Sequence, residues 1–294
     1  MKTLAGWLGF AALVLWAGQV WAAEPKAVSF PGLDGQGRQP PTMLSGLLFE
    51  PEPGGSETPE ALPAVVMLHG CKGMKAGERL HVLEAFWAEH WLGQGYVVLL
   101  VDSYTPRGIA SLCRTEEKDR PVSTVRDRAL DAYAALRWLT ARKEVDATRV
   151  ALIGWASGGG AVLSAIRPSM REAFAPLGRG FRAAIAFYPG NCRSLHQLGG
   201  WVPYSPLLIL MGQADDWTPP EPCEALVADA AAHHADASIR LFPDAYHDFD
   251  SPAAELRERP VGTARGSAHS GTDASARDAA IETATVFLRR QFAP

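Results

Sequence analysis

A glycine-rich turn that begins at Gly154 contains a position where a nucleophile could stand. The turn follows a short apolar run that predicts a strand, and it leads into a stretch typical of a helix. In a nucleophile elbow the reactive residue has a strained backbone, so the residues two before and two after it must be small. Gly154 and Gly158 form such a pair around Ala156, whereas a nucleophile at Ser157 would place Trp155 at a small position. The spacing therefore predicts the nucleophile at position 156, where alanine has no group that can attack.

Asp215 and His247 each follow one of two successive predicted strands, so both should lie at the carboxyl edge of a sheet. Position 156, then the aspartate, then the histidine is the order of nucleophile, acid and base in α/β-hydrolases. The histidine would take the proton of the nucleophile and return it to the leaving group, while the aspartate orients the imidazole ring. Their neighbours Asp216 and Asp248 could replace the acid, and we rank both below Asp215.

A third segment, Leu68-His-Gly-Cys-Lys-Gly, also follows a predicted core strand. Such a loop supplies one backbone N–H to an oxyanion hole, and the residue after the nucleophile supplies the other. Here the two donors would be the amides of Cys71 and Ser157. Because main-chain donors do not depend on the side chain at 156, we expect the hole to persist. We expect His69 to brace this loop and not to take part in the chemistry.

These segments must be positioned by an alternation of strands and helices. Short β-branched and leucine-rich runs predict strands at Thr42–Phe49, Ala64–Leu68, Tyr96–Val101, Val150–Ile153, Ala183–Phe187, Leu207–Met211 and Ser238–Phe242. Helical stretches lie at Glu78–Leu92, Val125–Arg142 (with Thr124 as N-cap), Gly159–Ile166, Glu221–His233 and Ser275–Phe292. Residues 251–274 lack periodicity, and we expect them to form a long mobile loop.

This alternation predicts a doubly wound, mostly parallel sheet of about eight strands with helices on both faces. The order of position 156, Asp215 and His247 along it is that of an α/β-hydrolase fold. Ligands then bind at the carboxyl ends of the strands. We expect residues 23–294 to form one such domain, because α/β folds commonly reach this length as a single unit.

Taken together, the motifs resemble those of the dienelactone hydrolase family, particularly its exported bacterial members. The resemblance covers the chain from about Ala64 to the final helix, and it is carried by Leu68-His-Gly-Cys, Val101-Asp-Ser-Tyr-Thr-Pro-Arg-Gly, Gly154-Trp-Ala-Ser-Gly-Gly, Ala186-Phe-Tyr-Pro-Gly, Gly212-Gln-Ala-Asp-Asp-Trp-Thr-Pro and Ala245-Tyr-His-Asp-Phe-Asp. It implies hydrolysis of carboxylic esters or lactones through a serine or cysteine nucleophile, with no cofactor and no metal. Dienelactone hydrolases proper have a glutamate where this chain has His69-Gly70, which leaves ester and lactone substrates both open.

By position, the resemblance places the family's acid on Asp215, its base on His247 and its nucleophile on Ala156. Three interpretations of the alanine remain open. The chain could be an enzyme whose serine has been replaced, a natural pseudoenzyme that binds substrate without turnover, or an esterase with a shifted elbow that uses Ser157.

Three further residues near the predicted edge are candidates for substrate binding: Tyr104, Arg107 and Trp155. The guanidinium of Arg107 could bind an anionic group of the substrate. A structural ion pair with Asp102 is the interpretation that we favour for it.

Composition and termini bear on the compartment. Lys2 precedes an apolar segment from Leu4 to Val20, and small residues at 20 and 22 predict a signal peptide cleaved after Ala22. In an oxidising compartment the four cysteines favour two disulfides, Cys71–Cys113 and Cys192–Cys223, although four reduced thiols remain an alternative. The signal peptide predicts a periplasmic or secreted protein. The net charge is −4 and no Lys/Arg-rich run is present, so we expect binding neither to nucleic acid nor, after cleavage, to a membrane. Oligomeric state stays open.

Overall fold

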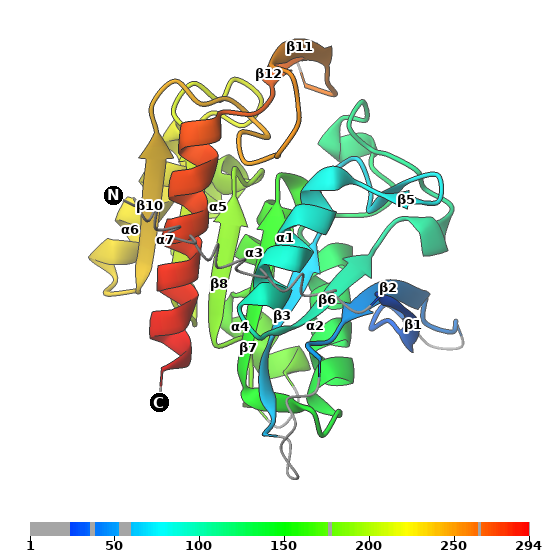
Figure 1. The fold of residues 1–294 in the computed structure, drawn as a ribbon. Coiled ribbons are helices and arrows are strands. Elements are labelled where there is room, and N and C mark those ends of the chain that lie inside the picture. Colours follow the sequence, from blue (N-terminus) through cyan, green and yellow to red (C-terminus); the bar gives the residue numbers. More distant parts are fainter. Residues whose placement is uncertain (1–23, 36–38, 53–59, 176–177, 264–265, 294) are drawn as a thin grey trace, which may run out of the picture.

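The computed structural model describes residues 24–35, 39–52, 60–175, 178–263 and 266–293. The predicted signal peptide lies outside these residues. Within them the main feature is an eight-stranded sheet in the order β1-β2-β6-β3-β7-β8-β9-β10 (Figure 1). In this order, the six strands β6, β3, β7, β8, β9 and β10 pair in parallel. At the other edge, β1 pairs antiparallel with β2, and β2 pairs antiparallel with β6. The predicted α/β fold is confirmed.

The strands of this sheet are β1 (Lys26–Pro31), β2 (Met43–Phe49), β3 (Leu62–Leu68), β6 (Val97–Asp102), β7 (Val145–Trp155), β8 (Ala183–Phe187), β9 (Leu207–Gly212) and β10 (Ala237–Phe242). Two small hairpins add β4 (Lys75–Ala76) with β5 (Arg79–Leu80), and β11 (Arg257–Pro260) with β12 (Ser267–Ser270). The helices are α1 (Val82–Gly93), α2 (Asp127–Thr140), α3 (Ser157–Ala165), α4 (Pro168–Phe174), α5 (Cys192–Leu198), α6 (Glu221–Ala232) and α7 (Ala274–Phe292), with single 3₁₀ turns at Thr105–Arg107 and Glu117–Asp119.

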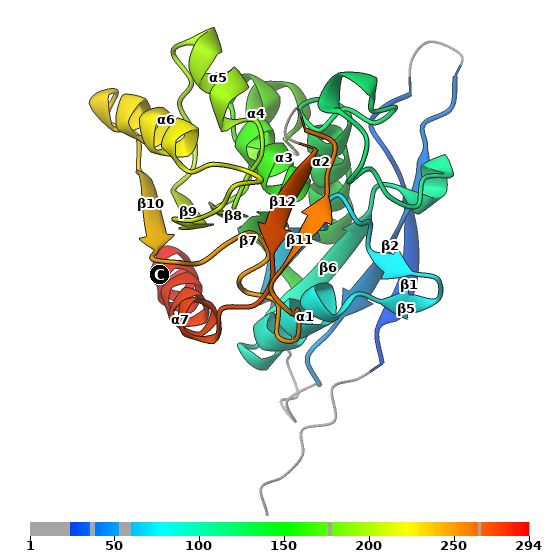
Figure 2. The same cartoon turned by 90° about the horizontal axis from the view of Figure 1, so that it is seen from above.

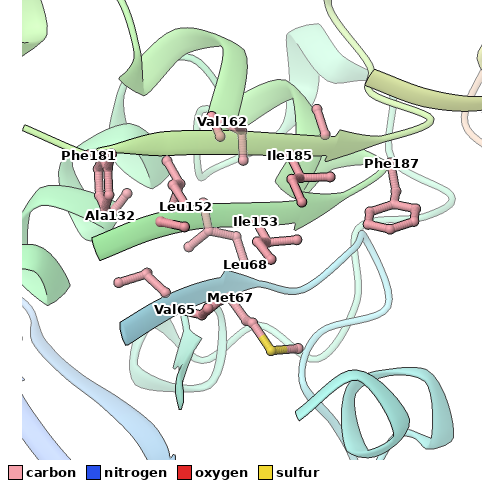
Figure 3. Close-up of a cluster of buried hydrophobic side chains, with 14 of the residues drawn as sticks. Val65, Met67, Leu68, Ala132, Leu152, Ile153, Val162, Phe181, Ile185 and Phe187 are labelled. Carbon is pink, nitrogen blue, oxygen red and sulfur yellow. The ribbon is translucent and has the colours of Figure 1, made fainter. Parts of the chain in front are cut away.

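Central strands are apolar along their whole length because helices cover both of their faces. Every residue of β6 and β8 is buried, as parallel strands between two helical layers require. The edge strand β10 instead alternates partly buried and exposed residues. In Figure 3 side chains from β3, β7 and β8 meet Val162 of α3 and Ala132 of α2 in one continuous cluster.

Helices α1 and α7 cover one face of the sheet and α2 to α6 the other (Figure 2). The last helix shows how its sequence sets its packing. Its buried residues recur every four positions (Ala276, Ala280, Ala284, Leu288 and Phe292), which places them on one stripe of the helix. The Asp273 carboxylate accepts a hydrogen bond from the Ala276 backbone N–H at 2.9 Å and so caps the first turn.

Several expected boundaries were wrong. The predicted helix at Glu78–Leu92 begins only at Val82, because the β4–β5 hairpin occupies the preceding residues. Thr124 is not the N-cap of α2; Arg126 has that position, without a side-chain cap. Strand β1 and helices α4 and α5 were not predicted, since they are short and their apolar pattern is weak.

The segment 251–274 is not a structureless loop. It contains the β11–β12 hairpin, which lies above the carboxyl edge of the sheet (Figures 1 and 2). The Gly262 backbone N–H donates to the Cys113 carbonyl at 2.8 Å, and His269 Nδ1 lies 2.9 Å from Asp216 Oδ2. These long-range bonds anchor a segment whose local sequence has no periodicity. None of the described helices is long and apolar enough to span a membrane.

Candidate active site

The turn after β7 has the backbone that the elbow pattern requires. Ala156 adopts φ 50° and ψ −111°, a strained conformation for a residue with a side chain. Its N–H donates to the Phe187 carbonyl at 3.0 Å, and its own carbonyl accepts from Gly160 and Gly190. The bonds to the end of β8 hold position 156 at the carboxyl edge of the sheet.

Both flanking glycines are needed on steric grounds. A Cβ on Gly154 would lie 2.4 Å from the Gly158 carbonyl oxygen, and one on Gly158 would lie 2.2 Å from that of Leu68. No side chain tolerates such contacts. The elbow is therefore centred on Ala156, which is 8% exposed at the floor of the site.

Ser157 is the first residue of α3, and its hydroxyl has a different partner. Its Oγ accepts a hydrogen bond of 2.9 Å from the guanidinium of Arg128, which is fully buried. Arg128 also donates to the His69 carbonyl at 2.6 Å. The arginine thus joins the elbow to the loop after β3, and no periodicity in the sequence pointed to it.

Asp215 and His247 meet as their positions predicted. His247 Nδ1 lies 2.8 Å from Asp215 Oδ2, and both side chains are buried. The other carboxylate oxygen, Oδ1, accepts the backbone N–H groups of Trp217 and Thr218, each at 2.9 Å. The Thr218 hydroxyl, which the sequence analysis missed, lies 2.9 Å from Asp215 Oδ2 and 3.1 Å from the Tyr188 carbonyl oxygen.

Burial lowers the pKa of His247, but the charge and hydrogen bond of Asp215 outweigh this effect and leave the pKa above its ordinary value. The imidazole packs between the rings of Tyr188 and Trp217, at centroid distances of 4.4 and 4.6 Å. Its Nε2 is buried and has no hydrogen-bond partner among the described residues. The ring is therefore fixed in orientation with one nitrogen free.

The neighbouring aspartates are engaged elsewhere. The Asp216 carboxylate accepts the backbone N–H of His269 at 2.8 Å. Asp248 pairs with the Lys72 ammonium. Among these carboxylates Asp215 is the one bonded to His247.

The loop after β3 lies over the elbow. A Cβ on Gly70 would come within 3.8 Å of the Ala156 Cβ. The backbone N–H groups of Cys71 and Ser157 donate to no backbone acceptor among the described residues, as expected for a loop residue and the first residue of a helix. Buried His69 braces the loop, since its Nδ1 lies 2.7 Å from the Gly70 carbonyl oxygen and its Nε2 accepts the Ser103 N–H at 3.2 Å.

Both predicted disulfides are present. Cys71 is bonded to Cys113 and Cys192 to Cys223, and no described cysteine is free. The first bond ties the loop over the elbow to the segment after β6, whose Cys113 carbonyl in turn holds the β11–β12 hairpin. The second joins α5 to α6.

Two cavities border the elbow, and both are lined by Cys71, Ala156, Trp217 and His247. The first has a volume of about 230 Å³ and extends past Thr218 and the Cys192–Cys223 disulfide to Arg120 and Arg193. The second, of about 190 Å³, extends toward the start of α1. A substrate of modest size can therefore extend from residue 156 into both cavities.

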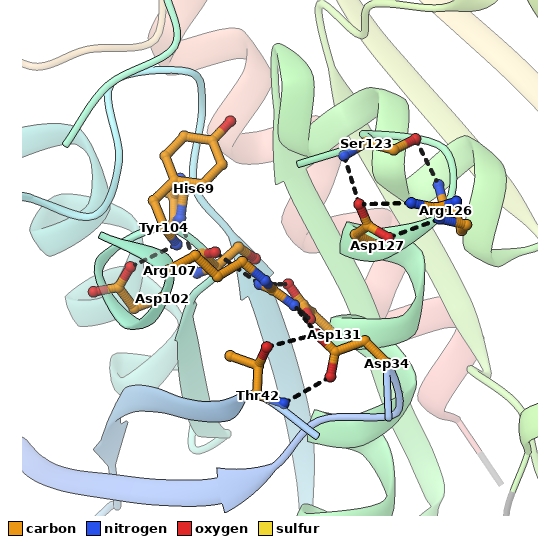
Figure 4. A network of polar contacts seen from close by, with 11 residues as sticks. Asp34, Thr42, His69, Asp102, Tyr104, Arg107, Ser123, Arg126, Asp127 and Asp131 are labelled. Atoms are coloured by element: carbon orange, nitrogen blue, oxygen red, sulfur yellow. Dashed lines mark hydrogen bonds and ion pairs between the residues drawn. The ribbon is translucent and has the colours of Figure 1, made fainter. Parts of the chain in front are cut away.

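The three candidate substrate-binding residues, Tyr104, Arg107 and Trp155, lie in different surroundings. Arg107 does not pair with Asp102; its guanidinium donates to both carboxylate oxygens of Asp131 at 2.9 Å and to Asp34 at 3.0 Å (Figure 4). Asp102 instead accepts the backbone N–H groups of Tyr104 and Thr105. The expected pairing was wrong because Asp34 and Asp131 come from distant segments that only the fold brings to Arg107.

Tyr104 is buried against His69 and lines neither cavity at the elbow. Trp155 lines the second cavity, but its indole N–H donates to Asp250 at 2.8 Å. Asp250 also accepts from Trp87 and Tyr188, so one buried carboxylate links α1, the elbow and the ring beside His247. Burial raises the pKa of Asp250 to about 6 against the opposing effect of these three donors. No local signal in the sequence marked this residue.

A family model describes residues 49–292 as a dienelactone hydrolase domain. The chain belongs to the dienelactone hydrolase family. No curated protein sequence matches it.

Among solved structures, a dienelactone hydrolase-like promiscuous phosphotriesterase from metagenomic libraries aligns with 92% of this chain and 100% of its own, at 22% identity and a TM-score of 0.65. A putative dienelactone hydrolase from Klebsiella pneumoniae aligns with 90% of this chain and 98% of its own, at 15% identity and a TM-score of 0.59. Thermogutta terrifontis esterase 2 aligns with 93% of this chain and 97% of its own, at 18% identity and a TM-score of 0.60. These structures share the fold of this family member.

Proposed function

We propose that this chain has the binding and acid–base parts of a carboxylic-ester or lactone hydrolase, and that Ala156 leaves it inactive or strongly impaired. The observation that carries the proposal is the state of His247. Asp215 holds one ring nitrogen, while the other is buried without a partner beside two cavities that also border Ala156. This arrangement suits a base that waits for the proton of a nucleophile.

The reaction can be followed with serine at position 156. The hydroxyl gives its proton to His247 Nε2 as its oxygen attacks the ester carbonyl, and the resulting oxyanion accepts hydrogen bonds from the Cys71 and Ser157 amides. The intermediate collapses as the imidazolium protonates the departing alcohol. Water then attacks the acyl-enzyme by the same route and releases the acid. With alanine, binding and polarisation of the ester remain, but no covalent step can occur.

The competing use of Ser157 is weaker. Its hydroxyl accepts a hydrogen bond from the buried Arg128. The positively charged guanidinium cannot act as the base that takes the proton of the serine. A pseudoenzyme that binds an ester without turnover uses the same site, and it is the second candidate because the alanine itself favours it.

The test compares the chain with its Ala156→Ser variant on short-chain p-nitrophenyl esters. Losing the serine of a comparable triad costs about 10⁶-fold in turnover and leaves roughly 10³–10⁴-fold over water. We therefore expect the variant to gain several orders of magnitude, and Ala156→Ser/His247→Ala to lose that gain. Thermogutta terrifontis esterase 2 has been solved phosphorylated by paraoxon. We expect paraoxon to label Ala156→Ser stoichiometrically and the unaltered chain not at all.

An unchanged rate in Ala156→Ser, despite native folding by circular dichroism, would refute the assignment of position 156. Stoichiometric labelling of the unaltered chain at Ser157 would favour the shifted elbow instead.

We also propose that the protein is exported and that residues 23–294 act as one hydrolase domain after removal of a signal peptide. The two disulfides support this placement, because such bonds persist in oxidising compartments.

A further inference from the structure

The cavity toward α1 contains polar groups that the proposed reaction does not use. It has a volume of about 190 Å³ and is lined by His81 and Glu84 from the start of α1, as well as by Ala156 and His247. Because it shares these last two residues with the proposed reaction centre, whatever occupies it lies directly beside the ester bond.

Glu84 is only 4% exposed and lines the cavity. Its carboxyl group accepts a hydrogen bond from its own backbone N–H. Burial raises its pKa to about 8, against smaller opposing effects of its own backbone N–H and of Lys72. At neutral pH the group is a protonated acid, which has a hydroxyl donor without an acceptor. His81 Nε2, on the same wall, is also buried and without a partner in the described part of the chain.

The charges around this cavity are compensated. The Lys72 ammonium pairs with Asp248, and Asp250 behind the wall accepts three hydrogen bonds. Burial and the nearby Lys72 lower the pKa of His81, so its imidazole is neutral at pH 7. A cation bound in this cavity would therefore meet no carboxylate whose charge is uncompensated. A bound anion would lie close to the acidic side chains of Glu84, Asp248 and Asp250.

We propose that this cavity is a subsite for an uncharged hydrogen-bond acceptor on the substrate, such as a second carbonyl group, and that Glu84 donates to it. The inference rests on the proposed function, since it takes the scissile ester to lie at residue 156. An unpaired buried donor costs free energy that an acceptor on the substrate recovers, and such groups commonly set specificity in otherwise apolar pockets. The substrate class is therefore an ester with a further keto or ester carbonyl a few atoms from the scissile bond.

The experiment measures binding to the unaltered chain, whose alanine prevents turnover. Two probes that differ by one carbonyl, methyl acetoacetate and methyl butanoate, are titrated by NMR at pH 7 and pH 9. At pH 7 we expect the keto ester to bind about 3- to 10-fold more tightly, the effect of one neutral hydrogen bond. Glu84→Gln, whose amide keeps a donor, should retain this preference. Glu84→Leu should abolish it.

The pH dependence separates donation by Glu84 from general packing. At pH 9 the carboxylate has no proton to donate, so the unaltered chain should lose the preference while Glu84→Gln keeps it. Glu89→Leu, on an exposed position of the same helix, is the matched control and should behave as the unaltered chain.

The subsite proposal is wrong if the preference for the keto ester survives in Glu84→Leu or is lost in Glu84→Gln. It is also wrong if the preference of the unaltered chain is larger at pH 9 than at pH 7. If both esters bind equally to every variant, the subsite fails and the proposed ester site stands. If neither ester binds to the unaltered chain up to its solubility limit, both proposals fail.

Discussion

A Cβ atom on Gly154 would lie 2.4 Å from the carbonyl oxygen of Gly158, across the turn that holds Ala156. This contact fixes the centre of the elbow one residue before Ser157. It also means that the strained conformation at position 156 depends on glycine at both flanking positions.

Gly158→Ala should therefore destabilise the protein by at least about 2 kcal/mol, because its Cβ would lie 2.2 Å from the Leu68 carbonyl oxygen of a neighbouring buried strand. Gly93→Ala is the control, since a Cβ there meets nothing within 4 Å. Urea unfolding of both variants measures the difference. Equal midpoints would contradict the close packing of the turn.

Ser157→Ala should cost about 1–3 kcal/mol of stability, because it leaves an N–H of the buried Arg128 without its acceptor. In the Ala156→Ser background the same change should lower kcat/KM by less than tenfold, since the proposed oxyanion donor at 157 is the backbone amide. The check is kcat/KM of the double variant on p-nitrophenyl butyrate. A loss of several orders of magnitude would show that the hydroxyl of Ser157 does the chemistry.

The pH profile of the Ala156→Ser variant should report on His247. The neutral imidazole is the active base, so kcat/KM should rise with pH and level off above the pKa of His247. Burial lowers that pKa but Asp215 raises it above the ordinary value of 6.5, so the midpoint should lie above 6.5. Asp215→Asn should move the midpoint down as well as slow the reaction. A midpoint that does not move would mean that another group titrates.

Glu84 should make the folded protein less stable as the pH rises. Its pKa is about 8 when folded and near 4.5 when unfolded, so the folded state binds more protons between these values. The stabilisation is fully present below pH 4.5 and is lost as the pH rises toward 8. In Glu84→Gln the fall in unfolding free energy between pH 5 and pH 8 should be clearly smaller, as measured by urea titrations at each pH. Parallel pH dependences of the two proteins would argue against a buried neutral Glu84.

Prediction from sequence worked best where the information is local. The elbow glycines, the strands before them and the order of Asp215 and His247 were visible because each depends on residue types a few positions apart. Boundaries that depend on distant partners were wrong, as in the hairpin within 251–274, which is held by Cys113 and Asp216.

The candidate site divides in the same way. Sequence could place the residues that carry the proposed chemistry, but not those that support them. Asp250 and Arg128 were missed because their roles consist of hydrogen bonds to segments far along the chain. Thr218 is only three residues from Asp215, but its second partner, the Tyr188 carbonyl, belongs to a distant segment. Arg107 was given the wrong carboxylate for the same reason, since nearness in sequence favoured Asp102 over Asp34 and Asp131.

By itself, the sequence determined the parallel fold and the alanine at the centre of the glycine-flanked turn, because periodicity and turn sterics are properties of short segments. It favoured the two disulfide pairs but left four reduced thiols as an alternative, and the structure shows both bonds. Only the tertiary structure decided that Ser157 binds Arg128, that Asp215 and not its neighbours holds His247, and that buried Glu84 lines a cavity with Ala156 and His247. Such facts arise when chain segments separated by tens of residues are buried together, and the free energy of a buried polar group depends on whichever partner the fold brings to it.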